Sequence, residues 1–233
     1  MATRFQLFGV VHLSILGAVV LVAAVLTALQ RRLPKEARWL RIGIGTALLL
    51  DSALWYAWQA WLGQPLFPDQ LPLELCDATL LLTAIVLLTL HPLLFDVAYY
   101  TALGGTTMAL VTPDLWEQFP SVATVQFFVA HGLVVASVLY LAWSGLARPR
   151  PWSVARAMAA INIYAAAVGL FDWGFGTNYM YLAAKPENAS LLDLLGPWPW
   201  YIAATEGVAL VLFTLLWLPW RLRKPASSRG PAA

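Results

Sequence analysis

The chain has 233 residues, of which 61% are hydrophobic and only 11% are charged, against roughly 25% charged residues in an average soluble domain. With a net charge of +2 and one cysteine, the sequence excludes a strongly basic nucleic-acid face, an internal disulfide framework and a Cys-rich metal site. The composition predicts an integral membrane protein made of α-helices, because a helix needs about 20 apolar residues to cross a bilayer.

Seven apolar stretches predict the transmembrane helices of one polytopic, all-α bundle. The expected spans cover about residues 7–29, 42–62, 73–90, 93–111, 122–143, 154–175 and 201–217. The first span is too long for a signal peptide and lacks a clear cleavage site, so we expect it to remain as an anchor. The spans form a single transmembrane domain, residues 1–224, and a polar tail, residues 225–233, is expected to be disordered in the cytoplasm.

Basic residues predict the sidedness of these helices. Five of them, Arg31, Arg32, Lys35, Arg38 and Arg41, follow the first span, whereas only Arg4 precedes it. The positive-inside rule therefore places the amino terminus outside and the carboxyl terminus in the cytoplasm. In a six-span alternative the fourth stretch, which contains Gly104 and Gly105, is re-entrant.

The segment Leu71-Pro72-Leu73-Glu74-Leu75-Cys76-Asp77 brings polar groups to the start of the third span. Charged side chains are costly in hydrocarbon, so their presence indicates a functional site. Two interpretations of Cys76 stay open, because a free cysteine also packs well as a small buried hydrophobe.

Further polar residues collect in the outer half of the expected spans. Those expected nearest the outer end are His12, Cys76, Asp77, Asp172 and Glu206. His131 lies deeper with Gln126 above it, and Asp51 and Asn162 lie near the middle of their spans. Intramembrane ionisable residues normally face the bundle interior or a wet cavity, so we expect an outward-opening polar pocket. The alternative is hydrogen bonding between helices, above all for the amides Gln126 and Asn162.

A lone cysteine with a histidine at reachable depth fits acyl transfer through a thioester. The thiolate is the reactive form, and histidine is the commonest base that generates it. We therefore expect Cys76 as nucleophile, His131 as general base, and Asp77 or Asp172 as the group that orients the base.

A zinc site is the competing chemistry. Cys76, His131, His12 and Asp77 are permissible zinc ligands, but no HxxxH or HExxH spacing supports them. No Gly-rich phosphate loop is present either. The sequence therefore predicts neither a bound metal nor a cofactor.

The longest outside segment, residues 178–201, mixes aromatic residues, turn formers and one cation. We expect Lys185 to hold a lipid phosphate above the pocket, with Asn178, Tyr179 and Tyr181 contributing to head-group binding. Part of the aromatic content is equally typical of an interfacial belt.

Several strings in the second half of the chain resemble the YwaF-like integral membrane family. They are LPLELCD, ALVTPDL followed by FP, QFFVAH, TNYMYLAAKP and SLLDLLGPWPWY. Relatives in that family include a vertebrate transmembrane acyltransferase that acts on ether phospholipids. The resemblance implies a Cys–His pair for acyl transfer, which falls on Cys76 and His131, and a membrane lipid as substrate. The family pattern PLHLC has a histidine where this chain has Glu74.

The sequence therefore predicts a membrane-embedded acyltransferase or transacylase that acts on phospholipid, with a lipid hydrolase as a variant of the same chemistry. A proton-coupled transporter or channel, with Asp51, His131, Asn162 and Glu206 along its path, is the main alternative. A sensor or assembly protein is the third. We expect an integral protein of a bacterial plasma membrane, with the lipid bilayer and phospholipid as its partners and no nucleic acid.

Overall fold

The computed structural model describes residues 5–113, 115, 119–186 and 191–222. Within these ranges the regular secondary structure is helical, as predicted. The tail expected to be disordered, residues 225–233, lies outside the described residues, so its state stays a prediction.

Seven long helical segments follow one another along the described part of the chain. They are α1 (Val10–Arg32), α2 (Pro34–Trp61), α3 (Leu75–Thr89), the continuous run α4 (Pro92–Tyr100), η1 (Thr101–Thr106) and α5 (Thr107–Val111), then α6 (Val122–Ser144), α7 (Ser153–Phe175) and α8 (Trp200–Leu222). Two short 3-10 turns, η2 (Tyr179–Tyr181) and η3 (Leu191–Leu195), lie between α7 and α8.

Four of these helices, α1, α6, α7 and α8, are long and apolar enough to cross a membrane. Helix α3 is apolar but shorter. Helix α2 and the run from α4 to α5 occupy the second and fourth expected spans. Neither is among the helices that are both long enough and apolar enough to cross a membrane. The membrane character of the chain is therefore supported, whereas seven crossings and the sidedness of the termini stay predictions.

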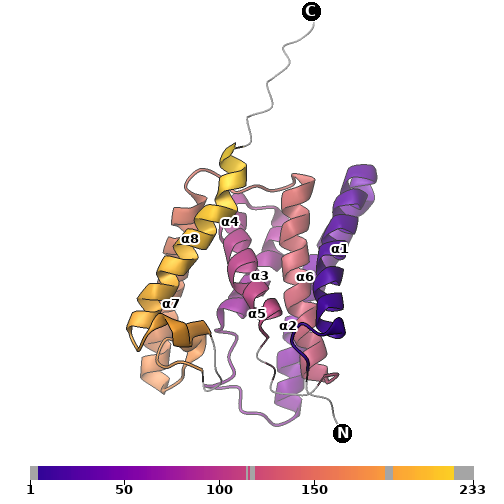
Figure 1. Cartoon of the computed structure of the whole chain (residues 1–233). Helices are drawn as coiled ribbons and strands as arrows, with labels where there is room; N and C mark the ends of the chain where they lie inside the picture. Colours follow the sequence, from indigo (N-terminus) through magenta and orange to yellow (C-terminus); the bar gives the residue numbers. More distant parts are fainter. Residues whose placement is uncertain (1–4, 114, 116–118, 187–190, 223–233) are drawn as a thin grey trace, which may run out of the picture.

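Helix α3 lies in the middle of the bundle, between α1, α2 and α6 on one side and α7 and α8 on the other (Figure 1). It packs against α2, α4, η1 and α6. Tyr100, Tyr140, Phe95 and Leu87 are among the largest fully buried side chains of this core. The start of α3 is thus surrounded by other helices, which suits a buried site.

Two glycines permit the close approaches that this packing needs. A Cβ atom on Gly45 of α2 would lie 3.1 Å from the carbonyl oxygen of Ala84 on α3. A Cβ atom on Gly104 of η1 would lie 2.8 Å from a ring carbon of Phe213 on α8. The second distance is shorter than carbon atoms tolerate, so Gly104 is needed where α8 rests on η1.

The fourth helical segment contains a π-helical turn, η1, in place of a regular α-helix. The backbone N–H of Thr107 donates to the carbonyl of Ala102, five residues earlier, and the hydroxyl of Thr107 donates to the same carbonyl at 3.1 Å. Such π-turns occur frequently at functional sites. This turn packs directly against α3.

The opposite end of the bundle is held by a buried ion-pair cluster. The carboxylate of Asp96 on α4 is fully buried and accepts hydrogen bonds from the guanidinium groups of Arg150 and Arg156, at 2.8 and 2.9 Å. The backbone N–H of Arg150 also donates to Asp96. The connection between α6 and α7 is thereby fixed to the start of α4.

Candidate functional site

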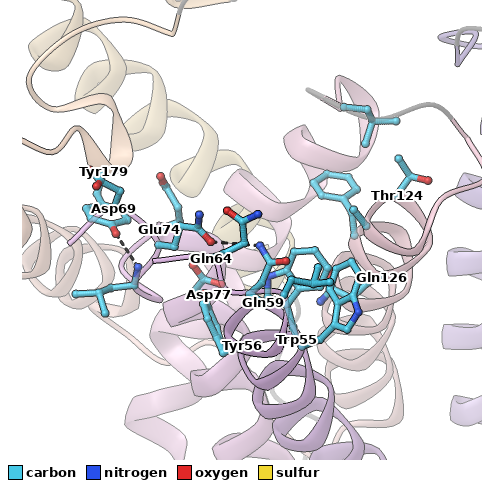
Figure 2. Close-up of a pocket in the computed structure, with 17 residues that line it drawn as sticks. Trp55, Tyr56, Gln59, Gln64, Asp69, Glu74, Asp77, Thr124, Gln126 and Tyr179 are labelled. Carbon is cyan, nitrogen blue, oxygen red and sulfur yellow. Dashed lines mark hydrogen bonds between the residues drawn. The ribbon is translucent and has the colours of Figure 1, made fainter. Parts of the chain in front are cut away.

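A cavity of about 880 Å³ opens between α2, the start of α3, α6 and the loop that joins α2 to α3 (Figure 2). Its walls are Trp55, Tyr56, Trp58, Gln59, Leu62, Gln64, Asp69, Gln70, Leu71, Glu74, Asp77, Leu115, Ala123, Thr124, Gln126, Phe127 and Tyr179. We call it the outer cavity. Of the expected site residues, Asp77, Gln126 and Tyr179 line it.

The outer cavity is acidic and aromatic. Three carboxylates, Asp69, Glu74 and Asp77, line it, and no Lys, Arg or His is among its described lining residues. In Figure 2, Asp77 lies next to Tyr56 of α2, and Gln126 lies next to Trp55. The chemistry of the walls combines hydrogen-bond acceptors with aromatic faces.

A smaller cavity of about 70 Å³ lies deeper between α3, η1 and α6. Its walls are Trp55, Cys76, Asp77, Leu80, Thr106, Gln126, Ala130, His131 and Val134. Trp55, Asp77 and Gln126 line both cavities, so the two spaces adjoin. We call this space the inner cavity, and it brings together the predicted nucleophile Cys76 and the predicted base His131.

Local helix capping fixes the position of Cys76. Glu74 is the N-cap residue of α3, and the Asp77 carboxylate accepts the Glu74 backbone N–H, which is one half of a capping box. The Tyr56 hydroxyl donates to the same carboxylate. The half-buried Cys76 therefore sits in the first turn of α3, between two residues that are held in place.

His131 is held in one orientation and one tautomer. Its Nδ1 lies 2.8 Å from the carbonyl oxygen of Phe127, one turn earlier on α6, and only a protonated Nδ1 can donate to a carbonyl. Its ring stacks on that of Phe127, with centroids 4.1 Å apart. The neutral imidazole then carries its lone pair on Nε2, as a general base requires.

A hydrogen bond joins α2 and α6 at the place where the two cavities adjoin. The Gln126 amide on α6 donates to the Asp51 carboxylate on α2 at 2.8 Å. Gln126 thus has the helix-linking role considered for it from sequence, while its side chain still lines both cavities. Asp51 itself lies outside both linings.

The loop after α7 closes over the start of α3 through three contacts. The backbone N–H of Met180 donates to the Glu74 carboxyl at 3.1 Å. The Tyr179 hydroxyl accepts the Leu71 N–H and donates to the Pro68 carbonyl, both at 2.7 Å. Burial raises the pKa of the Glu74 carboxyl to about 7, and the nearby Asp77 adds to this rise while the Met180 N–H opposes it.

Asp172 supports this loop from beneath. Its Oδ1 accepts the Thr177 hydroxyl at 2.6 Å and the Tyr179 N–H at 3.1 Å. It lies outside both cavity linings and makes no described contact with His131. The group that orients His131 is the Phe127 carbonyl, not Asp172 or Asp77.

Five other expected binding residues lie outside both linings. His12 is fully buried, where its two ring nitrogens contact the Phe8 N–H and the Leu110 carbonyl. Asn178 folds its own loop by hydrogen bonds to Ala183 and Ala184.

The other three lie on the α7–α8 side of the bundle. The Tyr181 carbonyl accepts the Tyr201 hydroxyl. Lys185 pairs with Asp193 at 3.6 Å and lies over the Tyr201 ring. Glu206 accepts the Asn162 amide at 2.9 Å. Each of these three residues thus contacts a local partner on this side of the bundle.

The described residues do not form the zinc site considered as an alternative from sequence. Among the residues that the structure describes, no group of three or more His, Cys, Asp and Glu side chains is close enough to hold a metal ion. His12 in particular is held elsewhere by its own two contacts.

Several cavity residues were not among the sequence candidates. Trp55, Tyr56, Trp58 and Gln59 recur on α2 at the spacing of one helical face, a signal that the run WYAWQAW carries. Thr106, in the π-turn η1, lines the inner cavity.

Comparison with known proteins gives a family and one distant relative. Residues 7–217 match the model of the TMEM164 family. The chain is 25% identical over 238 residues to an uncharacterized protein of Treponema pallidum (strain Nichols), with 93% of this chain and 90% of the relative covered. No solved structure matches.

Proposed function

The chain belongs to the TMEM164 family, and from that premise we propose that it is a membrane-embedded lipid acyltransferase that uses Cys76 and His131. The substrate in this proposal is a phospholipid of the surrounding bilayer. The membrane is that of a bacterial cell, in keeping with the bacterial source of the relative.

The observation that carries the proposal is the shared inner cavity. Cys76 from the first turn of α3 and His131 from α6 line one space of about 70 Å³. That space adjoins the larger, polar outer cavity, and the hydrogen bond to Phe127 leaves the His131 Nε2 lone pair available. A thiol, a base and an entrance are the minimum that nucleophilic acyl transfer requires.

In the first half-reaction Nε2 of His131 takes the thiol proton, and the Cys76 sulfur attacks the carbonyl carbon of a phospholipid ester. The tetrahedral intermediate collapses as the ester C–O bond breaks. The imidazolium returns its proton to the departing lysophospholipid oxygen, and the acyl chain remains on Cys76 as a thioester.

In the second half-reaction a lipid hydroxyl attacks the thioester carbonyl. His131 accepts the hydroxyl proton and passes it to the departing sulfur, which restores the thiol. Water in place of the lipid hydroxyl gives hydrolysis. Asp77 caps α3 and so positions Cys76, while the loop anchored on Glu74 and Tyr179 shields the reaction space from bulk water.

The proposal is tested by acyl exchange in vesicles. Purified protein is reconstituted with phosphatidylethanolamine and phosphatidylglycerol that carry isotope-labelled acyl chains, plus an unlabelled lysophospholipid. We expect label transfer with the native protein and losses on the order of 10³-fold for Cys76→Ala or His131→Ala. The control His91→Ala changes an exposed histidine at the opposite end of the bundle and leaves the rate unchanged. Exchange that persists in Cys76→Ala contradicts the proposal.

A further inference from the structure

Threonine hydroxyls in the helices of this protein usually donate to the carbonyl four residues earlier. Thr79 donates to Leu75 at 2.7 Å and Thr101 donates to Val97 at 3.2 Å. Such bonds satisfy a hydroxyl that faces an apolar surrounding. A buried threonine without one is therefore an exception that needs a reason.

Thr106 is such an exception. The residue is 2% exposed, and its hydroxyl has no hydrogen-bond partner of regular geometry among the described residues. The carbonyl four residues earlier belongs to Ala102. In the π-turn that carbonyl already accepts both the backbone N–H and the hydroxyl of Thr107. In the π-turn the Ala102 carbonyl thus bonds Thr107 twice and is not the partner of the Thr106 hydroxyl.

The side chain of Thr106 lines the inner cavity with Cys76 and His131. Three other polar side chains of that lining have partners. Gln126 donates to Asp51, Asp77 accepts from Tyr56 and Glu74, and His131 is bonded through Nδ1 to Phe127. The Thr106 hydroxyl is therefore an O–H donor whose polar neighbour is the Cys76 thiol, a weak acceptor, and which has no oxygen or nitrogen partner among the described residues.

We infer that the Thr106 hydroxyl is a catalytic hydrogen-bond donor for the acyl oxygen that becomes negative when Cys76 attacks. This inference rests on the proposed acyl transfer. As the Sγ–C bond forms, the carbonyl electron pair moves to oxygen, and the Thr106 O–H donates to that oxyanion. When the intermediate collapses, the pair returns to re-form the carbonyl and the C–O bond to the leaving lysophospholipid breaks.

The physical advantage lies in preorganisation. A donor that is already desolvated and faces only a weak sulfur acceptor gives up little when negative charge appears on oxygen in the transition state. The cost of leaving it unpaired is met in the folded protein, where the π-turn is held by the packing of η1 against α3 and α6. A strained or unsatisfied group at a reaction site is the expected sign of such a role.

The experiment measures single-turnover acylation of Cys76 by intact-protein mass spectrometry, with long-chain p-nitrophenyl ester and with labelled phospholipid vesicles as probes. Thr106→Val removes the hydroxyl but keeps the shape, and we expect it to slow acylation by about 10- to 100-fold. Thr106→Ser keeps the hydroxyl and is expected to stay within about 3-fold of the native rate. Native acylation rates in Thr106→Val, or an equally slow Thr106→Ser, overturn the inference.

Thr83→Val is the matched control, because Thr83 is also buried and its hydroxyl also lacks a partner, but it lines neither cavity. Its acylation rate is expected to equal the native one. A loss as large as that of Thr106→Val would mean that any buried threonine matters for folding alone, and it would overturn the inference.

Alkylation of Cys76 by an iodoacetamide separates the donor role from a packing role, since alkylation forms no oxyanion. We expect Thr106→Val to be alkylated at the native rate while its acylation is slow. Equal slowing of both reactions contradicts the inference. If the native protein forms no acyl adduct, acyl transfer itself fails, whereas an adduct that is indifferent to Thr106→Val removes only the role of Thr106.

Discussion

Gln126 on α6 donates a hydrogen bond of 2.8 Å to the carboxylate of Asp51 on α2, and the Gln126 side chain lines both cavities. This contact ties two helices together where the inner cavity joins the outer one. A charge-assisted hydrogen bond of this kind contributes both stability and alignment.

Gln126→Leu is expected to leave the Asp51 carboxylate without this donor. Hydrogen bonds to charged groups contribute about 1.5–3 kcal/mol, so the variant should unfold at a lower temperature in detergent. Asn162→Leu, which removes the more exposed partner of Glu206, is the control and should have a smaller effect. Equal unfolding temperatures for native protein and Gln126→Leu would contradict a linking role.

Gly104→Ala should destabilise the bundle, because its Cβ atom would lie 2.8 Å from the Phe213 ring. Overpacking of this kind costs about 1–3 kcal/mol. The double variant Gly104→Ala with Phe213→Leu should recover part of the loss, which thermal unfolding measures. Gly207→Ala on α8 meets nothing within 4 Å and is expected to be neutral. Failure of the double variant to recover stability would count against the packing argument.

Asp96→Asn should weaken the end of the bundle opposite the cavities. The substitution leaves Arg150 and Arg156 without their buried carboxylate, and breaking a buried ion pair costs about 3 kcal/mol. Because the cluster lies at the end of the bundle opposite the cavities, acylation of Cys76 should be unaffected at temperatures where the variant is folded. Limited proteolysis between α6 and α7 measures the local effect, and an unchanged cleavage rate would contradict it.

Glu74 predicts a pH dependence of the loop after α7. Its pKa of about 7 in the folded protein lies above the ordinary value of 4.5, so the folded state binds the proton more tightly than the unfolded state. Its contribution to stability is therefore full below pH 4.5 and is lost as the pH rises through 7.

Glu74→Gln should remove this dependence while its amide oxygen still accepts the Met180 N–H. The measurement is hydrogen exchange of the segment near Met180 between pH 5 and 8, corrected for the intrinsic pH dependence of exchange. Glu206→Gln serves as control. The same pH profile in native protein and Glu74→Gln would show that another group controls the loop.

Sequence reasoning located a site residue best where its depth along a helix was all that had to be known. Cys76 is expected about one turn into its span and His131 deeper, about nine residues into its own, at a distance where contact is possible; both line the inner cavity. Depth follows from counting residues at 1.5 Å each. The helical bundle and the membrane character follow from composition in the same way.

Sequence reasoning failed where the rotation of a helix or the path of a loop decides whether a residue lines a cavity. Tryptophan side chains such as Trp55 and Trp58 of α2 are compatible with facing either lipid or a cavity. Their position in the wall of the outer cavity follows only from how the helices pack. Lys185 was expected above the pocket, but it pairs with Asp193. In the π-turn at Thr106 a backbone N–H bonds five residues back instead of four, and the turn packs against α3 and α6. A local sequence pattern does not specify such a turn.

The central claim is that an acyl chain passes through a thioester on Cys76, and trapping that thioester tests it most directly. Native protein, Cys76→Ala and His131→Ala are incubated with labelled phospholipid vesicles, quenched in acid and mapped by peptide mass spectrometry. We predict a hydroxylamine-sensitive acyl group on the peptide that contains Cys76 in the native protein, strongly reduced in His131→Ala and absent in Cys76→Ala. Label transfer between lipids with no acyl group on Cys76, or an adduct of equal yield in all three proteins, would contradict the account.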